Sequence, residues 1–231
     1  MNERTAKYLI ILLAACIPIF VFYYFPKEYM IDDAAFTLKY IDNILDGNGY
    51  RFNAEDDPIF GSSSFLMTYL ASAIKWLLPD TWCDTSFIHC RLPGYVGFVV
   101  VIIVFYWLGQ LIHNWLTGIL AAGLIVGFPD YVIYSNSGIE TLMAAAFYAF
   151  AAYSFYTRKT PSIVYGFCFL MVITKHDLIL PAGILALSQL CLNLFPQKRI
   201  SYYNIVSFLL IFLLPSILFL VFCWWYFGMI I

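Results

Sequence analysis

Long apolar runs separated by short polar segments make up most of this 231-residue chain. A helix needs about 20 apolar residues to cross a bilayer core of roughly 30 Å. The runs that approach this length are 8–25, 92–112, 116–134, 139–155, 163–173, 178–195 and 205–225. The pattern predicts an all-α membrane protein with about seven transmembrane helices, organised as one module over residues 1–231.

The run at 163–173 is too short to cross a membrane alone. Together with the next run it flanks the triplet Lys175-His176-Asp177. We therefore expect these charged residues to lie below the membrane surface, at the tip of a short helix hairpin.

The long segment 26–91 has helical periodicity of its own. Ala34, Leu38, Ile41 and Leu45 form one apolar stripe, which Asp32 or Asp33 starts and the glycines after residue 46 end. A second apolar stretch, 65–78, follows a run of three serines. The pattern predicts two amphipathic helices that lie on the outer membrane surface.

Composition fits a lipid solvent. Hydrophobic residues make up 63% of the chain and charged residues only 11%, about half the usual fraction for a soluble domain. The net charge of −2 gives no reason to expect a nucleic-acid partner.

Basic residues set the predicted orientation. Arg4 and Lys7 precede the first run, Arg158-Lys159 follow the fourth, and Lys198-Arg199 follow the sixth. With seven crossings all of them fall on one face, which is then cytoplasmic. The first run lacks a small-residue cleavage site and is interpreted as a retained helix. The N-terminus is then cytoplasmic, and the segment 26–91 is an extracytoplasmic loop.

The six cysteines do not indicate a zinc site, because no C-x-x-C or His/Cys cluster occurs. Cys83 and Cys90 fall together in the outer segment, where a disulfide can form. The sequence leaves open whether they are bridged.

Asp32-Asp33 is the first candidate for chemistry. One carboxylate at this position is an ordinary helix cap. Two adjacent carboxylates at the membrane surface can also take a proton from a sugar hydroxyl, or hold a divalent cation such as Mg²⁺ or Mn²⁺ against a phosphate. The sequence leaves open whether Asp32 and Asp33 cap the helix or carry chemistry.

Ionisable residues at membrane depth suggest a site or a pathway. Lys175 could pair with Asp177 and simply hold the hairpin together, or the cations of the triplet could neutralise a lipid phosphate. Glu140 could cap a helix with Ser137 in a capping box. Arg91, at the outer mouth of the second run, could extend to lipid headgroups.

Four stretches together resemble the GT-C glycosyltransferase superfamily, especially its AftB-like arabinofuranosyltransferase branch. Residues 32–53 resemble the opening D-D-A-(Y/F)…R-Y…G-x-G-(L/Y)-x-(F/Y)-N, and residues 61–66 resemble G-Y-T-S-P-L. Residues 137–141 are similar to S-G-M-E-T, and residues 174–177 to T-R-P-D. Their order and spacing also agree with the family.

This resemblance implies an enzyme that takes a sugar from a polyprenyl-phosphate donor and transfers it to an extracytoplasmic glycan or lipid acceptor in the cell (inner) membrane. It assigns the catalytic base to Asp33 or Asp32. Lys175, His176, Asp177 and Glu140 would line the donor-phosphate or acceptor site, and Arg91 would also face phosphate. Relatives continue past a seventh span, so the chain is expected to match their N-terminal membrane module.

Two departures from the family bear on the donor, because Phe65 replaces the usual Pro and Lys175 the usual Arg. Two alternatives stay open. The chain could be a small transporter or lipid flippase whose path contains Lys175 and Asp177, or a non-catalytic lipid-binding fragment of a longer transferase.

Overall fold

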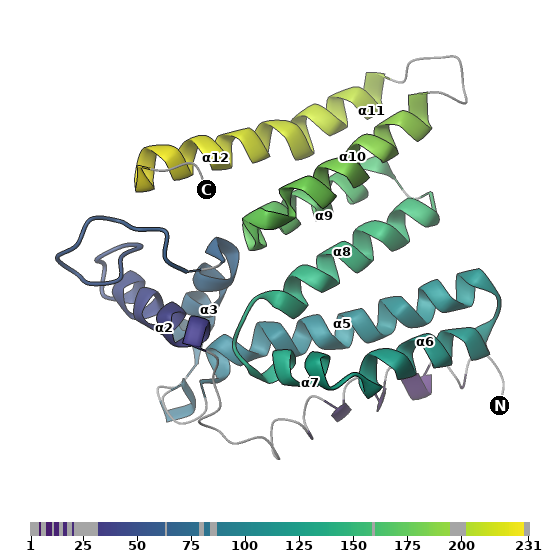
Figure 1. Ribbon diagram of the computed structural model, residues 1–231, viewed down its shortest axis with the longest axis horizontal. Helices are drawn as coiled ribbons and strands as arrows, with labels where there is room; N and C mark the ends of the chain where they lie inside the picture. The colour runs from purple at the N-terminus through teal and green to yellow at the C-terminus, as the bar shows by residue number, and fades with distance from the viewer. Residues whose placement is uncertain are drawn as a thin grey trace.

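The computed structural model describes residues 32–62, 64–78, 81–83, 87–158, 160–194 and 202–228, with isolated positions before residue 21. Every regular element in these residues is a helix, which confirms the predicted all-α class. The principal helices are α2 (Asp32–Leu45), α3 (Phe65–Leu77), α5 (Ile88–Ile112), α6 (Trp115–Gly127), α7 (Pro129–Asn136), α8 (Thr141–Tyr156), α9 (Pro161–Thr174), α10 (Ile179–Leu194), α11 (Tyr202–Ser207) and α12 (Leu214–Phe227). The helices from α5 onward lie side by side in a row, and α2 and α3 lie together beside the left-hand ends of these helices (Figure 1). We call this side the α2–α3 end of the row.

Two helices are long and apolar enough to cross a membrane. They are α5 and the continuous helix Tyr202–Phe227, which joins α11 to α12 through the π-helical turn Phe208–Leu213 (η2). A third crossing exists if α6 and α7 are counted as one bent span. The seven predicted crossings are therefore not confirmed, and the first of them, 8–25, lies outside the described residues apart from isolated positions.

The predicted run 116–134 is broken because of a proline. Helices α6 and α7 meet at an angle of 62°. Phe128, between them, has extended backbone angles, and Pro129 opens α7. Proline lacks an N–H and disfavours the helical conformation of the residue before it, so one straight helix cannot pass this point.

Three further apolar helices are shorter than a crossing requires. Helices α8 and α10 have 16 residues each and α9 has 14. At about 1.5 Å per residue they extend about 21–24 Å, less than the roughly 30 Å of a bilayer core. Length, and not composition, is what separates these helices from the longer ones.

The two helices of the segment 26–91 are present, close to their predicted bounds. Ala34 and Ile41 of the stripe are fully buried, and Ile41 packs with Ala71 of α3 and Cys90 of α5. The chain leaves α2 at Gly47, whose φ of +81° favours glycine. The Ser64 hydroxyl caps α3 by accepting a hydrogen bond from the Met67 N–H.

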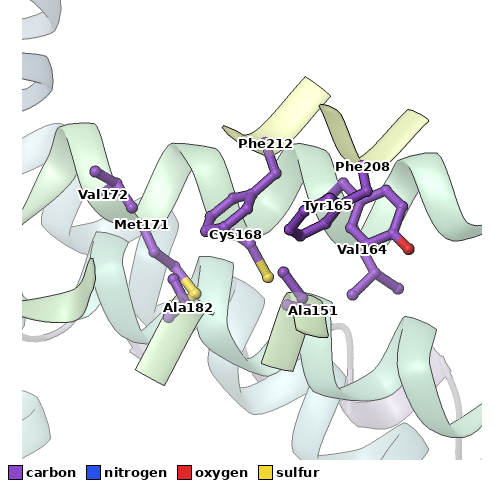
Figure 2. Close-up of a cluster of buried hydrophobic side chains, with 10 residues drawn as sticks. Ala151, Val164, Tyr165, Cys168, Met171, Val172, Ala182, Phe208 and Phe212 are labelled. Carbon is purple, nitrogen blue, oxygen red and sulfur yellow. The ribbon is translucent and has the colours of Figure 1, made fainter. Parts of the chain in front are cut away.

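Helix α9 is the centre of the second half of the row. Figure 2 shows its side chains Tyr165, Cys168 and Met171 among side chains from α8 and α10 on one side and from η2 on the other. The neighbours contribute Ala151, Ala182, Phe208 and Phe212 to the same cluster. Small residues on α8 and α10 let those helices approach α9 closely, while the phenylalanines of η2 fill the space opposite them.

Aromatic side chains are exposed near both ends of the row. The α2–α3 end has Trp76, Trp82, Trp224 and Trp225, and the opposite end has Tyr156, Tyr202 and Tyr203. Exposed leucines cover the intervening length of the last helix, for example Leu210 and Leu218. Apolar surface between two aromatic ends is typical of a protein that sits in a bilayer.

Helices α5 and α8 are in backbone contact at Gly97. A Cβ atom at this position would lie 2.6 Å from the backbone of Leu142, closer than real Cβ atoms come to their neighbours. Gly123 of α6, by contrast, has no atom within 4 Å of the equivalent point. The two glycines therefore form a matched pair for testing this contact.

We expect Gly97→Ala to lower the free energy of unfolding in detergent by about 1–3 kcal/mol, because the added methyl group forces α5 and α8 apart. Gly123→Ala should be neutral or stabilising by up to about 1 kcal/mol, because alanine is the better helix former. Thermal unfolding of both purified variants measures this, and equal stability of the two would contradict the close packing of α5 on α8.

Candidate functional site

A buried ion pair lies where α8 and α9 approach the α2–α3 end of the row. Glu140 Oε1 is 3.1 Å from Lys175 Nζ. The Glu140 side chain is 4% exposed, whereas that of Lys175 is 33% exposed. A carboxylate buried this deeply is costly unless a cation compensates it. Lys175 provides that cation and still reaches solvent or lipid headgroups with part of its side chain.

Two interruptions of the helices bring this pair together. Gly138 has φ of +78°, which favours glycine, and so the chain turns between α7 and α8. Glu140 follows in that turn, directly before the first residue of α8. Lys175 follows the last residue of α9 and has extended backbone angles. Both charged side chains therefore leave from helix ends and not from lipid-facing helix surfaces.

The capping-box interpretation of Glu140 is wrong. Helix α8 has no side-chain cap, and the Ser137 hydroxyl donates to the Tyr134 carbonyl instead. The proposed Lys175–Asp177 pair is also wrong, because Lys175 pairs with Glu140 and His176 Nε2 lies 2.9 Å from Asp177 Oδ1.

His176 and Asp177 lie in a single 3-10 turn, His176–Leu178 (η1), between α9 and α10. Asp177 is largely exposed, while His176 is one-third exposed. The edge of the His176 ring faces Phe60, with centroids 6.0 Å apart. The three residues therefore make two separate interactions. Lys175 pairs with the buried carboxylate of Glu140, and His176 and Asp177 interact with each other at the surface.

Arg91 does not extend to the surface, as one prediction had it. Its side chain is fully buried in the first turns of α5. One turn further along, the Tyr95 hydroxyl donates to the Asn136 side-chain oxygen at the end of α7. Asn136 is itself fully buried. Buried polar side chains therefore also join the first turns of α5 to the end of α7.

The aspartates at the start of α2 are separate from the ion pair. Asp33 is exposed and makes no ion pair with a described residue, and its backbone carbonyl accepts a hydrogen bond from Thr37 Oγ1 at 3.0 Å. The side chain of Asp32 lies outside the described part of the chain. Among the described residues, no group of three or more His, Cys, Asp and Glu side chains could hold a metal ion. The divalent cation stays a prediction.

The structure has a buried row of hydroxyl groups next to α2 that the sequence analysis did not predict. The Thr37 and Ser62 hydroxyls lie 3.1 Å apart, and Ser62 and Thr68 lie 2.9 Å apart. The Tyr50 hydroxyl lies 3.5 Å from Thr68. Burial raises the pKa of Tyr50 to about 12, so this hydroxyl stays protonated. The run of serines before α3 was the feature of the sequence that could have indicated this row. In the structure, Ser62 of this run attaches the loop to α2 through Thr37.

The loop over residues 46–62 covers this end of the row with aromatic rings. Tyr50 is fully buried, and its ring meets Phe227 at the end of α12 with centroids 5.4 Å apart. Phe60 contacts the same Phe227 ring at 5.1 Å as well as His176. The loop is therefore fixed at once to η1 and to the last helix.

Lys175 and Glu140, from two of the sequence motifs, are in contact, while Asp33 and Arg91 occupy other elements. Cys90 is a buried thiol outside any disulfide, so no bridge joins it to Cys83.

No family model matches the chain, and neither a curated protein nor a solved structure is significantly similar to it.

We expect Lys175→Met to lower the free energy of unfolding by about 2–3 kcal/mol, because it leaves Glu140 charged and buried without its cation. The loss stays below the roughly 3–5 kcal/mol of a fully buried pair, since Lys175 is partly exposed. The double variant Lys175→Met/Glu140→Gln should recover at least half of the loss. Chemical unfolding in detergent measures this coupling.

The matched control is the ion pair between Lys75 of α3 and Asp42 of α2, at 2.8 Å, in which Asp42 is half exposed. Lys75→Met should cost less than about 1 kcal/mol, as is usual for exposed pairs. Equal losses at the two lysines, or no recovery in the double variant, would mean that Glu140 does not depend on Lys175.

Proposed function

We propose that this chain is the membrane module of a glycosyltransferase that uses a polyprenyl-phosphate-linked sugar as its donor and glycosylates a glycan or lipid acceptor. The observation that carries the proposal is the Glu140–Lys175 pair. These residues come from two of the four stretches that resemble the GT-C superfamily, 35 positions apart. A partly exposed cation held at a helix break, among apolar helices, is suited to a phosphate on a lipid.

Lys175 is the residue that we assign to the donor phosphate. An ammonium group has three N–H donors, and Glu140 occupies one side of it. The remaining donors are free to bind phosphate oxygens, while the buried carboxylate fixes the position of the ammonium group. Charge that develops on the departing phosphate is then stabilised by a group that is already in place, which is the efficient form of electrostatic catalysis.

Asp33 is assigned the role of base. It lies in the first turn of α2, a position at which a negatively charged side chain complements the helix dipole. Helix α2 packs on α3, and α3 contacts α9, whose end carries Lys175. Asp33 and Lys175 are thus at the same end of the row on different elements, as expected if one binds the acceptor and the other the donor.

The reaction is a direct displacement. The acceptor hydroxyl oxygen attacks the anomeric carbon, and the bond from that carbon to the phosphate oxygen breaks. The polyprenyl phosphate leaves with the electron pair, and the hydroxyl proton passes to Asp33. Positioning the two substrates in line is the largest task for the protein.

We further propose that the module lies in the cell (inner) membrane, with its N-terminus in the cytoplasm and the α2–α3 end outside. The support is the distribution of basic residues in the sequence. The connection between α8 and α9 lies at the end of the row opposite to α2 and α3 (Figure 1), and Arg158 belongs to this connection in the sequence.

We expect polyprenyl phosphate to raise the melting temperature of the purified chain saturably. A ligand at about 100 times its dissociation constant stabilises a protein by roughly 2.7 kcal/mol. Lys175→Gln/Glu140→Gln, which removes both charges together, should abolish this shift. Lys75→Gln/Asp42→Asn is the control with the same charge change at the other pair, and it should keep the shift. A shift that survives the first double variant would contradict the phosphate site, and no shift in the wild type would favour a lipid-independent role.

We expect Asp33→Asn to reduce sugar transfer at least about a hundredfold, the usual scale for loss of a general base, while polyprenyl-phosphate binding is unchanged. The product should have the inverted configuration at the anomeric carbon, read by NMR. A retained configuration would contradict direct displacement. Movement of the lipid-linked sugar across vesicles without transfer would favour a flippase instead.

A further inference from the structure

The outward face of α2 contains an open groove of about 510 Å³, which we call the Phe36–Phe52 groove. It is lined by Ala35, Phe36, Lys39 and Phe52. This volume is within the usual range of roughly 300–1,000 Å³ for small-molecule sites. The opposite face of α2 is the one that packs on α3 and α5, so the groove is not part of the internal packing.

The groove is held in shape by hydrogen bonds behind it. Asn43 is almost fully buried, and its side-chain amide donates to the carbonyls of Arg51 and Phe52 at 3.0 and 2.8 Å. These bonds fix the backbone at Phe52. The Phe36 and Phe52 ring centroids lie 5.6 Å apart with their planes at 45°, so the two rings pack against each other and form one aromatic surface. A ligand would meet a preformed surface and would not have to order it, which lowers the cost of binding.

Two polar groups border these rings. Lys39 is exposed and makes no ion pair or hydrogen bond with a described residue. Asp33 stands one helical turn before Phe36 and is also exposed. Phe36 itself is 50% exposed. The aromatic surface of the groove is therefore partly exposed, with one cation and one anion beside it.

We infer that the Phe36–Phe52 groove binds a neutral sugar ring of the acceptor, an inference that rests on the proposed function. A sugar ring has an apolar C–H face, which packs on an aromatic wall, and a rim of hydroxyl groups. Lys39 donates hydrogen bonds to the oxygens of that rim. Lys39 attracts an anion and the neighbouring Asp33 repels it, so the two charges offset each other. A neutral sugar therefore fits better than a phosphate or an acidic glycan.

The groove also lies close to the proposed base, because Asp33 is one helical turn before Phe36. A ring held on Phe36 and Phe52 presents its hydroxyl groups one helical turn from the carboxylate that takes the proton. The rings then select the acceptor, and Asp33 activates it. The donor is bound by a different element, at Lys175.

The test is sugar binding to the chain in lipid nanodiscs, which avoids glycoside detergents. The probes are linear trisaccharides of D-arabinofuranose, D-galactofuranose, D-mannopyranose and D-glucopyranose, and the readout is the concentration dependence of the melting temperature. At least one trisaccharide should stabilise the wild type saturably. Phe52→Ala should weaken that binding about tenfold, the scale of one lost aromatic contact, and Lys39→Ala should weaken it also.

Phe128→Ala is the control, because Phe128 is 53% exposed but lies at the α6–α7 bend, outside the groove. It should leave the binding unchanged. The inference is overturned if no trisaccharide binds, or if Phe52→Ala binds as tightly as the wild type. Polyprenyl phosphate added to the same nanodiscs separates the two proposals. A lipid-phosphate shift without sugar binding removes only the groove, whereas sugar binding that depends on Phe52 without a lipid-phosphate shift removes the transferase and keeps the sugar site.

Discussion

The Glu140–Lys175 ion pair is the interaction on which this end of the molecule depends. A carboxylate that is almost fully buried among apolar helices requires a cation, and that cation must come from an element that can reach it. Both residues are placed at helix ends, so the pair limits where the helices stop. Helix α8 begins directly after Glu140, and α9 ends directly before Lys175. The shortness of these two apolar helices is thus tied to the position of the charges.

Local patterns were sufficient for the elements that depend on local rules. The stripe through Ala34 and Ile41, the serine before α3 and the glycine after α2 predicted both helices of the outer segment. The apolar run of α5 predicted a long helix in the same way. Hydropathy alone failed at Phe128, because an apolar run gives no sign of a break. The neighbouring Pro129 did give one, and its missing N–H outweighs any continuity of apolar residues.

The candidate site was predicted only in part, because local patterns show single charged residues but not their contacts with distant ones. A charged triplet between two apolar runs is visible in the sequence. Because burying a charge in a membrane costs free energy, Lys175 could be identified as a candidate site residue. No local pattern identifies Glu140 as its partner, because Glu140 is 35 positions away and the contact depends on the packing of α8 against α9. Only the family resemblance assigned the two residues to one site. Arg91 was expected at the surface because its long side chain can extend there. Its burial follows from the position of α3 and α7 around the start of α5, which no local pattern contains.

The loop between α2 and α3 connects the two halves of the proposed reaction. Asn43 and Tyr40 attach it to α2, the latter through a hydroxyl that donates to the Ile59 carbonyl. Phe60 attaches the same loop to His176, beside Lys175. The separation of Asp33 from Lys175 therefore depends on this loop as well as on the packing of α2 on α3 and of α3 on α9. Phe52, which lines the Phe36–Phe52 groove, belongs to the loop. A change of ring size at Phe52 or Phe60 would alter the alignment of the two substrates without touching either charge. In the proposed reaction, which depends on in-line geometry, the loop would then contribute to acceptor selectivity together with Phe36 and the charged residues of α2.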